Sequence, residues 1–292
     1  TQGGGIAKFD GDDFTVYNEG NGLTSNYIES LLVLGNQLFI GTKKGLSVLT
    51  KNKFTPFISP QINALYHHEG IVYAATASGI YSYVSDEGFQ KIALSEEVNT
   101  AFINDVLYDG SHFWIAANSG LYKTKSLFQR SPISILETLP FPSLAKYGDY
   151  VFAASFADGI LVYDISEKQR QRVVLAQPLQ IQSLAILEEQ LWVCTNQGVT
   201  IIDAKSLQFQ KSIGSQNGLT VSHVRESFMD RQGNVWLGTS GGGLYHYFPN
   251  EFTHFDRDTG LPGNRIYAAE ATKNKIWFSV SENGLVYIDS LG

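Results

Sequence analysis

The chain has 292 residues, of which 43% are hydrophobic and 17% are charged, and this composition excludes an intrinsically disordered chain. The formal net charge of −7 argues against a nucleic-acid partner, because nucleic-acid binding needs a basic surface. The single cysteine, Cys194, excludes a disulfide framework, and no apolar run is long enough to span a membrane.

Two short strands are predicted near the start of the chain, at residues 5–9 (GIAKF) and within 12–17 (DDFTVY). They correspond to the third and fourth strands of a repeat that recurs further along. Because the first residue is Thr1 and the only methionine is Met229, we expect the chain to be a piece of a longer protein.

A strand pair with a glycine-containing turn recurs along the whole chain. It occurs at residues 37–49, 71–83, 112–124, 150–163, 190–202, 233–247 and 275–288. The glycine before the second strand of the pair lies at Gly5, Gly45, Gly79, Gly120, Gly159, Gly198, Gly243 and Gly284, so that successive glycines are 34 to 45 residues apart. Short apolar blocks broken by glycine, with a period near 40 residues, are typical of β-propeller blades.

The first full repeat shows how one blade is expected to form. Strands are predicted at 27–34, 38–42, 46–50 and 54–57, joined by polar turns. Four short antiparallel strands make a strongly twisted sheet, and such sheets bury both apolar faces by stacking around an axis. A column of small residues lets neighbouring sheets approach closely: Gly41, Ala75, Ala116, Ala154, Cys194, Gly238 and Ser279.

Counting the strands predicts an all-β, seven-bladed β-propeller of four-stranded antiparallel blades, forming one domain over residues 1–292. First and second strands each occur seven times. The last repeat, at 264–288, has three strands and lacks its fourth. We therefore expect the N-terminal strand at 14–17 to complete the last blade and close the ring.

Three repeats share a longer motif. Residues 21–49 and 217–247 both begin N-G-L-T and continue with an apolar strand, an aromatic strand ending in G-T, and G-L, while 259–288 repeats the order with Pro262 for the threonine. This pattern closely resembles the two-component regulator propeller repeat of bacterial hybrid histidine kinases and related signalling proteins. The four middle repeats keep the strand pair but lose the N-G-L opening.

The resemblance implies a periplasmic ligand-sensing module that has no catalytic activity or cofactor of its own. In some members of the family the ligands are oligosaccharides. The expected partners are therefore a small molecule or oligosaccharide and the downstream domains of the same receptor, with a homodimer of the full-length receptor left open. Neither nucleic acid nor membrane contact is expected for this part of the protein, and any kinase lies outside it.

Propellers bind ligands at one end of the central channel, where the loops before the first strands meet the loops between second and third strands. Aromatic, histidine and guanidinium groups in these loops suit stacking on sugar rings and hydrogen bonding to hydroxyls. The predicted ligand-binding residues at this channel mouth are Tyr27, Phe102, Phe156, His223 and Arg265.

No catalytic or metal-binding motif is found. The acidic runs at 10–13 and 256–258 lack the spacing of a calcium loop, and H-E-x-x-H, P-loop and dinucleotide fingerprints are absent from the sequence. The G-x-S-x-G spacing at 238–242 joins two predicted strands and opens no helix, so it does not form a nucleophile elbow. Two alternatives stay open. One is a protein-interaction scaffold, and the other is a metal-dependent lyase-type enzyme in which His223 would work with Glu29 or Glu282.

Overall fold

The computed structural model describes residues 3–9, 14–85, 87–128, 131–156, 158–175, 179–219, 221–247, 266–271, 275–280 and 284–289. The chain divides into two compact units, Thr1–Tyr247 and Phe248–Gly292, and each is described by itself. The expectation of a single domain over residues 1–292 stays a prediction.

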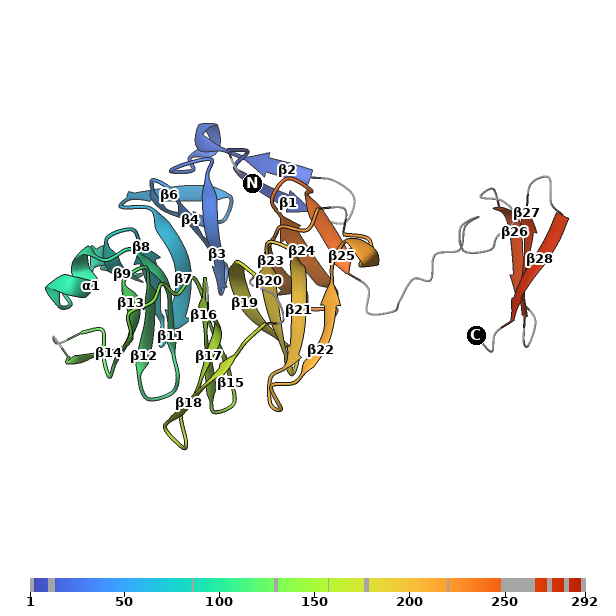
Figure 1. Ribbon diagram of the computed structural model, residues 1–292. Helices are drawn as coiled ribbons and strands as arrows, with labels where there is room; N and C mark the ends of the chain where they lie inside the picture. The colour runs from blue at the N-terminus through green and yellow to red at the C-terminus, as the bar shows by residue number, and fades with distance from the viewer. Residues whose placement is uncertain are drawn as a thin grey trace. The chain divides into compact units, whose positions relative to one another are not determined.

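The first unit is built from antiparallel sheets that follow the sequence repeat (Figure 1). Five of them have four strands. These are β3(Ile28–Leu34), β4(Gln37–Thr42), β5(Gly45–Thr50) and β6(Lys53–Ile58); β7(Ile62–His68), β8(Ile71–Thr76), β9(Gly79–Val84) and β10(Gly88–Lys91); β11(Ile103–Tyr108), β12(Phe113–Ala117), β13(Gly120–Thr124) and β14(Ile133–Glu137); β15(Leu144–Tyr147), β16(Tyr150–Ser155), β17(Gly159–Asp164) and β18(Gln169–Val173); β19(Ile181–Leu187), β20(Gln190–Thr195), β21(Gly198–Asp203) and β22(Phe209–Ile213). A three-stranded sheet follows, with β23(Val224–Met229), β24(Val235–Thr239) and β25(Leu244–Tyr247).

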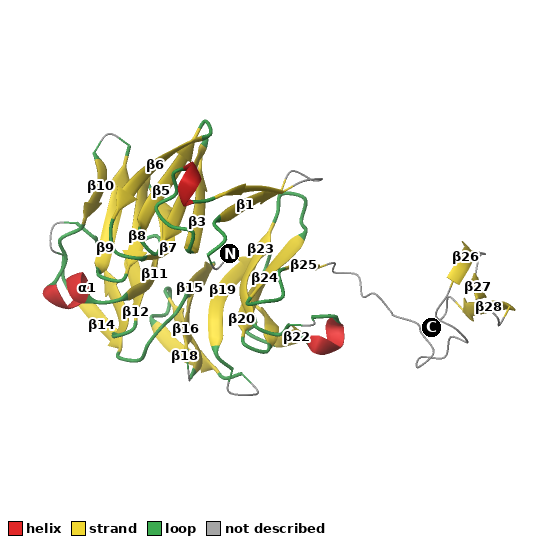
Figure 2. Ribbon diagram, turned by 90° about the horizontal axis from the view of Figure 1, so that it is seen from above, coloured by secondary structure: helices red, strands yellow, loops and turns green. Residues whose placement is uncertain are grey.

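The first strand of each sheet is the innermost one. β3 contacts β7, β7 contacts β11, and the series continues through β15 and β19 to β23. Figures 1 and 2 show the sheets following one another around these inner strands. This is the blade arrangement of a β-propeller, and the four strands predicted for the first repeat are confirmed by β3 to β6.

The hydrophobic core is divided among the interfaces between successive blades. Phe39 and Leu46 of the first blade pack with Ile62 and Val72 of the second, and the later interfaces repeat the arrangement. Each blade therefore buries apolar side chains on the faces it shares with its neighbours.

The column of small residues lies at these interfaces. A Cβ atom added at Gly41 would come within 2.6 Å of Ile62 Cγ2 in the next blade, so only glycine fits there without a shift. At the corresponding Gly238 the nearest atom is 4.0 Å away. The expected close approach of sheets is thus confirmed at Gly41 but does not apply to Gly238.

The propeller has six blades, and the prediction of seven is wrong. The N-terminal strands β1(Ile6–Phe9) and β2(Phe14–Tyr17) pair with each other in a two-stranded sheet and do not complete the last repeat. Ile6 and Tyr17 instead pack against Leu23, Ile40 and Phe54 of the first blade. The strand count failed because a strand joins a blade by backbone hydrogen bonds to the edge of its sheet, and the sequence does not specify which edge β1 and β2 pair with.

In the second unit, the last repeat forms a three-stranded antiparallel sheet of β26(Ile266–Ala271), β27(Lys275–Val280) and β28(Gly284–Asp289). The described helices are short. They are α1(Glu96–Thr100) and two 3₁₀ turns, η1(Glu19–Asn21) and η2(Ser215–Asn217). None of the helices within the described residues could cross a bilayer.

Candidate functional site

A repeated backbone hydrogen bond brings two sets of loops together at one end of the blades. In five blades, the residue before the first strand accepts a hydrogen bond from the N–H of a residue in the loop between the second and third strands. The pairs are Tyr27 with Lys43, Gln61 with Ala77, Phe102 with Asn118, Gln180 with Asn196, and His223 with Ser240, at 2.9 to 3.1 Å. These loops define the surface that we call the channel mouth.

A threonine at the end of the second strand shapes the loop beside it. The Thr42 hydroxyl donates to the carbonyl of Gly45 (2.9 Å) and accepts from the N–H of Lys44 (3.1 Å). Thr76, Thr195 and Thr239 make the same pair of contacts in their blades. The glycine that ends each of these turns has a positive φ, which is 123° at Gly45 and is a conformation that glycine adopts without strain. The threonine therefore holds the mouth loop in one shape.

Three of the predicted site residues lie in mouth loops. Tyr27 is 47% exposed, and the Lys43 Nζ atom lies 4.8 Å from its ring centre. Phe156, in the turn between β16 and β17, is 43% exposed, whereas Phe102 is half-buried. These side chains belong to different blades, and no ring contact or hydrogen bond joins them within the described part of the chain.

His223 also borders the mouth, but the structure does not pair it with a carboxylate. Its Nε2 atom is buried and has no hydrogen-bond partner in the described residues. The pairing with Glu29 that a lyase would need is therefore not formed. Arg265 and Glu282 lie outside the described residues, so their predicted roles stay predictions.

Several amides near the mouth are committed to holding blades together. Asn63 Nδ2 donates to the carbonyl of Ile103 in the next blade (2.6 Å), and Asn104 Nδ2 donates to the carbonyl of Phe141 (2.8 Å). The Arg225 guanidinium donates to Gln182 Oε1 (3.1 Å) in the preceding blade. Because these donors already have partners, the exposed aromatic side chains are the more available groups at the mouth.

Two carboxylates on the inner strands were missed by the sequence reasoning. Asp105 and Glu226 occupy the position after a register shift in β11 and in β23. Burial raises the pKa of Asp105 to about 6, although hydrogen bonds from Leu144, Val106 and Ser143 oppose the rise. The signal was available, since both are acidic residues two positions after the first apolar residue of a predicted inner strand, Ile103 or Val224.

Glu226 has a pKa raised to about 7, first by burial and second by the charge of Asp105. The side chain touches solvent, but protein surrounds it at longer range, and this surrounding protein weakens the hydration of the charge. No group of three or more His, Cys, Asp or Glu side chains in the described residues is placed to hold a metal ion.

A second feature missed from the sequence is an aspartate that organises the turn between first and second strands. Asp109 accepts hydrogen bonds from the Ser111 and His112 N–H groups and from Trp114 Nε1 (2.7 Å). Asp230 is bonded in the same way to Trp236 Nε1 (2.9 Å) in the sixth blade. These turns stabilise their blades, at the hairpin ends away from the mouth loops.

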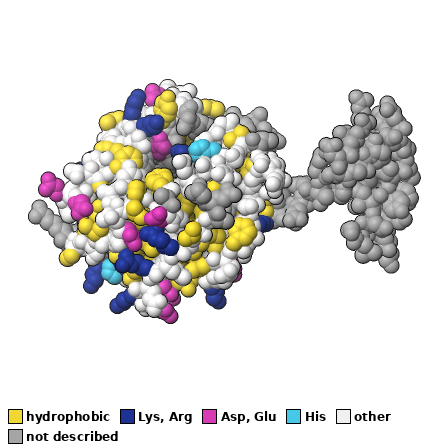
Figure 3. Space-filling model, in the orientation of Figure 1, with side chains coloured by type: hydrophobic (Ala, Val, Ile, Leu, Met, Phe, Trp, Pro, Cys, Tyr) yellow, Lys and Arg dark blue, Asp and Glu magenta, His cyan; other side chains and the backbone are white. Residues whose placement is uncertain are grey.

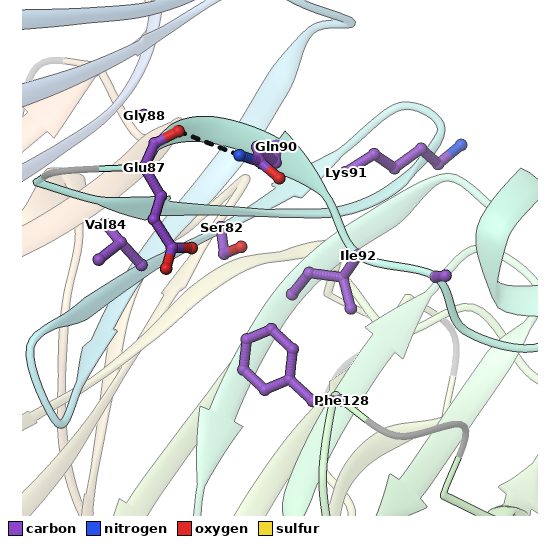
Figure 4. Close-up of a pocket in the computed structure, with 9 residues that line it drawn as sticks. Ser82, Val84, Glu87, Gly88, Gln90, Lys91, Ile92 and Phe128 are labelled. Carbon is purple, nitrogen blue, oxygen red and sulfur yellow. Dashed lines mark hydrogen bonds between the residues drawn. The ribbon is translucent and has the colours of Figure 1, made fainter.

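Two pockets, each of about 320 Å³, lie outside the mouth. Figure 4 shows the one at the outer strands β9 and β10, where Phe128 and Ile92 face Ser82 and Glu87. Gln90 Nε2 is already bonded to the carbonyl of Glu87 there (3.0 Å). Neither pocket is lined by a predicted site residue.

The surface of the first unit carries no broad field of one charge on the face shown in Figure 3. Lys and Arg side chains lie among Asp and Glu side chains and scattered apolar ones. Such a mixed surface suits neutral ligands better than nucleic acid.

Residues 136–256 match the family described as WD40 repeated domain. Among solved structures, the extracellular domain of the putative one component system BT4673 from B. thetaiotaomicron is similar, with 18% identity and a TM-score of 0.71 over 98% of this chain and 42% of that one. The extracellular domain of the putative hybrid two component system BT3049 from B. thetaiotaomicron gives 19% identity and a TM-score of 0.65 over 90% of this chain and 39% of that one.

The WD40 β-propeller domain of Doa1 is also similar, with 12% identity and a TM-score of 0.67 over 86% of this chain and 88% of that one. No curated protein matches the chain. The chain spans about two fifths of the length of the two B. thetaiotaomicron structures. These comparisons confirm, at the level of the fold, the resemblance to two-component regulator propellers.

Proposed function

From a fold shared with extracellular domains of two-component systems, we propose that this propeller is the ligand-binding sensor region of a bacterial two-component-type receptor. It would lie in the periplasm, bind an oligosaccharide at the channel mouth, and act on downstream domains of the same receptor. It would have no catalytic role of its own. A homodimer of the full receptor stays a prediction.

The observation that carries the proposal is the construction of the mouth. Exposed aromatic side chains, Tyr27 and Phe156, lie in mouth loops on the ring of blades, and Thr42 braces the loop that bonds to Tyr27. Aromatic faces stack on the apolar faces of sugar rings, and a rigid scaffold lowers the entropy lost on binding. Lys43 beside Tyr27 adds hydrogen-bond donors for sugar hydroxyls or carboxylates.

The test is a thermal-shift screen of the chain against a panel of oligosaccharides, followed by calorimetry on any hit. A ligand that binds only the folded state raises Tm in proportion to its affinity. We expect Tyr27→Ala and Phe156→Ala each to weaken a hit about tenfold, because one lost stacking contact is worth about 1–1.5 kcal/mol.

Phe209→Ala is the matched control, because Phe209 is 64% exposed but lies on the outer strand β22. It should leave affinity unchanged. A panel that shifts no Tm would count against the oligosaccharide, and equal weakening by all three variants would count against the mouth as the binding surface.

The scaffold alternative has weaker support. It rests on the WD40 match over residues 136–256 and on the likeness to Doa1. A pull-down would favour the scaffold if Tyr27→Ala still captured the same protein partner as the natural sequence. No sugar should change the amount of partner captured.

A further inference from the structure

The pocket shown in Figure 4 lies where the outer strands of the second blade meet a loop of the third blade. Ser82 and Val84 of β9 lie on one face of the sheet with Gln90 of β10, because side chains alternate along a strand and Gln90 is opposite Ser82. Ile92 follows β10 and is buried in the core shared with the third blade. Phe128, from the loop between β13 and β14, completes the pocket.

The Ser82 hydroxyl is a buried polar group that lines this pocket. Only 9% of Ser82 is exposed, and its hydroxyl has no hydrogen-bond partner among the described residues. The Gln90 amide on the neighbouring strand is engaged elsewhere, since its Nε2 atom donates to the carbonyl of Glu87 (3.0 Å). A buried hydroxyl without a partner is costly, and most such groups in proteins are satisfied by water or a ligand. The pocket therefore offers a polar contact that the protein itself does not use.

Glu87 gives the pocket a negative charge. Its carboxylate lies on the same side of the pocket as the Ser82 hydroxyl, and it forms no ion pair within the part of the chain that the structure describes (Figure 4). Lys91 extends away from the pocket and donates a hydrogen bond from Nζ to the carbonyl of Asn99 (2.9 Å). The charge that these residues direct into the pocket is therefore negative, and it favours a cationic ligand.

Phe128 supplies an aromatic face opposite these polar groups. Its side chain is 40% exposed, and its ring centre lies 6.3 Å from that of Tyr73, the residue opposite Ser82 on β8. This contact places the Phe128 ring beside the row of residues that carries the Ser82 hydroxyl. An aromatic face attracts a cation that lies within about 6 Å of the ring centre, and more strongly where water is excluded. The aromatic wall and the carboxylate thus favour the same sign of charge.

We propose that this pocket binds the ammonium group of a small organic amine. The Glu87 carboxylate pairs with the charge, the Ser82 hydroxyl accepts a hydrogen bond from the ammonium group, and the Phe128 ring covers it. An ammonium group has three donors and no acceptor, which matches two oxygen acceptors and a π face. The carbon chain of the amine packs on Val84 and Ile92, which gives the ligand an apolar part next to its charge.

The size of the pocket limits the ligand. A volume of about 320 Å³ is at the low end for small-molecule sites, so it admits a free amine of a few carbons or one lysine side chain of another protein. A ligand this small binds with a Kd of about 1 mM. The site is separate from the proposed sugar surface, because none of its lining residues lies in the mouth loops.

The experiment is a titration of the full chain with n-butylammonium chloride at pH 7 and constant ionic strength, followed by ligand-detected NMR. We expect saturable binding at one site, a weakening of about tenfold in Glu87→Gln, and a weakening of about threefold in Phe128→Leu. Ser82→Ala should weaken binding about threefold without lowering Tm, because the hydroxyl has no partner within the protein. Acetyl-lysine methylamide as a second probe distinguishes the two sources: tighter binding than n-butylammonium indicates a lysine side chain, and weaker binding a free amine.

Glu96→Gln is the matched control, since it removes the same charge from an exposed position on α1 that does not line the pocket. It should bind n-butylammonium like the natural sequence, and the neutral analogue 1-butanol should bind at least fivefold more weakly to the natural sequence. The absence of saturable binding up to about 10 mM, ten times the expected Kd, would overturn the proposal. Equal binding of 1-butanol, or undiminished binding by Glu87→Gln shown to be folded by circular dichroism, would overturn it as well.

Discussion

At the scale of single residues, we expect the two turns with an aspartate–tryptophan hydrogen bond to stabilise the fold more where the tryptophan is more buried. Trp114 is fully buried and bonds Asp109 across the hairpin, while Trp236 makes the same bond to Asp230 at a partly buried position. A hydrogen bond to a charged group contributes about 1.5–3 kcal/mol when it is shielded from water.

We expect Trp114→Phe to lower the free energy of unfolding by about 2–3 kcal/mol, because the buried carboxylate loses a donor and a small cavity forms. Trp236→Phe is the matched variant and should lower it by only about 1 kcal/mol. Urea denaturation followed by circular dichroism measures both. An equal loss in the two variants would show that burial does not set the strength of this bond.

Asp109 also makes stability depend on pH. Burial acts to raise its pKa, but hydrogen bonds from Trp114, Ser111 and His112 outweigh burial and lower it below the usual value of 3.8. Because the folded state holds this carboxyl ionised, its contribution is complete above the unfolded pKa and is lost as pH falls through the folded one.

The natural sequence should therefore be more stable than Asp109→Asn at pH 7, and the difference should shrink between pH 5 and pH 2. Thermal unfolding of the two proteins across this range measures it. A difference that stays constant with pH would mean that the Asp109 charge is not involved.

At the scale of elements, the spacing between neighbouring blades depends on single positions in the second strand. Gly41→Ala should lower the free energy of unfolding by about 1–3 kcal/mol, because the added methyl group would overlap Ile62 of the second blade. Gly238→Ala changes the same repeat position where the space is open, and should stay within about 0.5 kcal/mol. If the two variants lost the same free energy of unfolding, contact with the next blade would not be the cause of the loss in Gly41→Ala.

Most strands of the first unit could be predicted from the sequence, because the repeat marks each turn with glycine. The roles of the inner-strand side chains could not. Asn63 and Asn104 lie near the mouth, yet they bond to carbonyls of the next blade, and such a bond depends on inter-blade distances that a sequence does not contain. The blade number failed for a related reason, since β1 and β2 pack on the first blade through Ile6 and Tyr17.

At the scale of the whole molecule, the interfaces between blades are nearly independent. Each apolar cluster is shared by two neighbours, so a change at one interface leaves distant ones untouched. Gly41→Ala lies between the first two blades, and Trp114→Phe lies between the third and fourth.

The double variant should lose the sum of the two single losses, within about 0.5 kcal/mol, because distant sites without shared partners add. Urea denaturation of the four proteins of this cycle measures the coupling. If the loss in the double variant differed from the sum of the two single losses by more than about 1 kcal/mol, the two interfaces would be energetically coupled.

The amides that bond across blades have an evolutionary consequence. Replacing Asn63 or Asn104 would remove a hydrogen bond between neighbouring blades. A change of ligand specificity at these two positions would therefore cost stability. Tyr27 and Phe156 carry no such structural duty within the described residues, and both side chains are exposed. Diversification within this lineage should therefore concentrate on these few aromatic positions, while the joints change slowly.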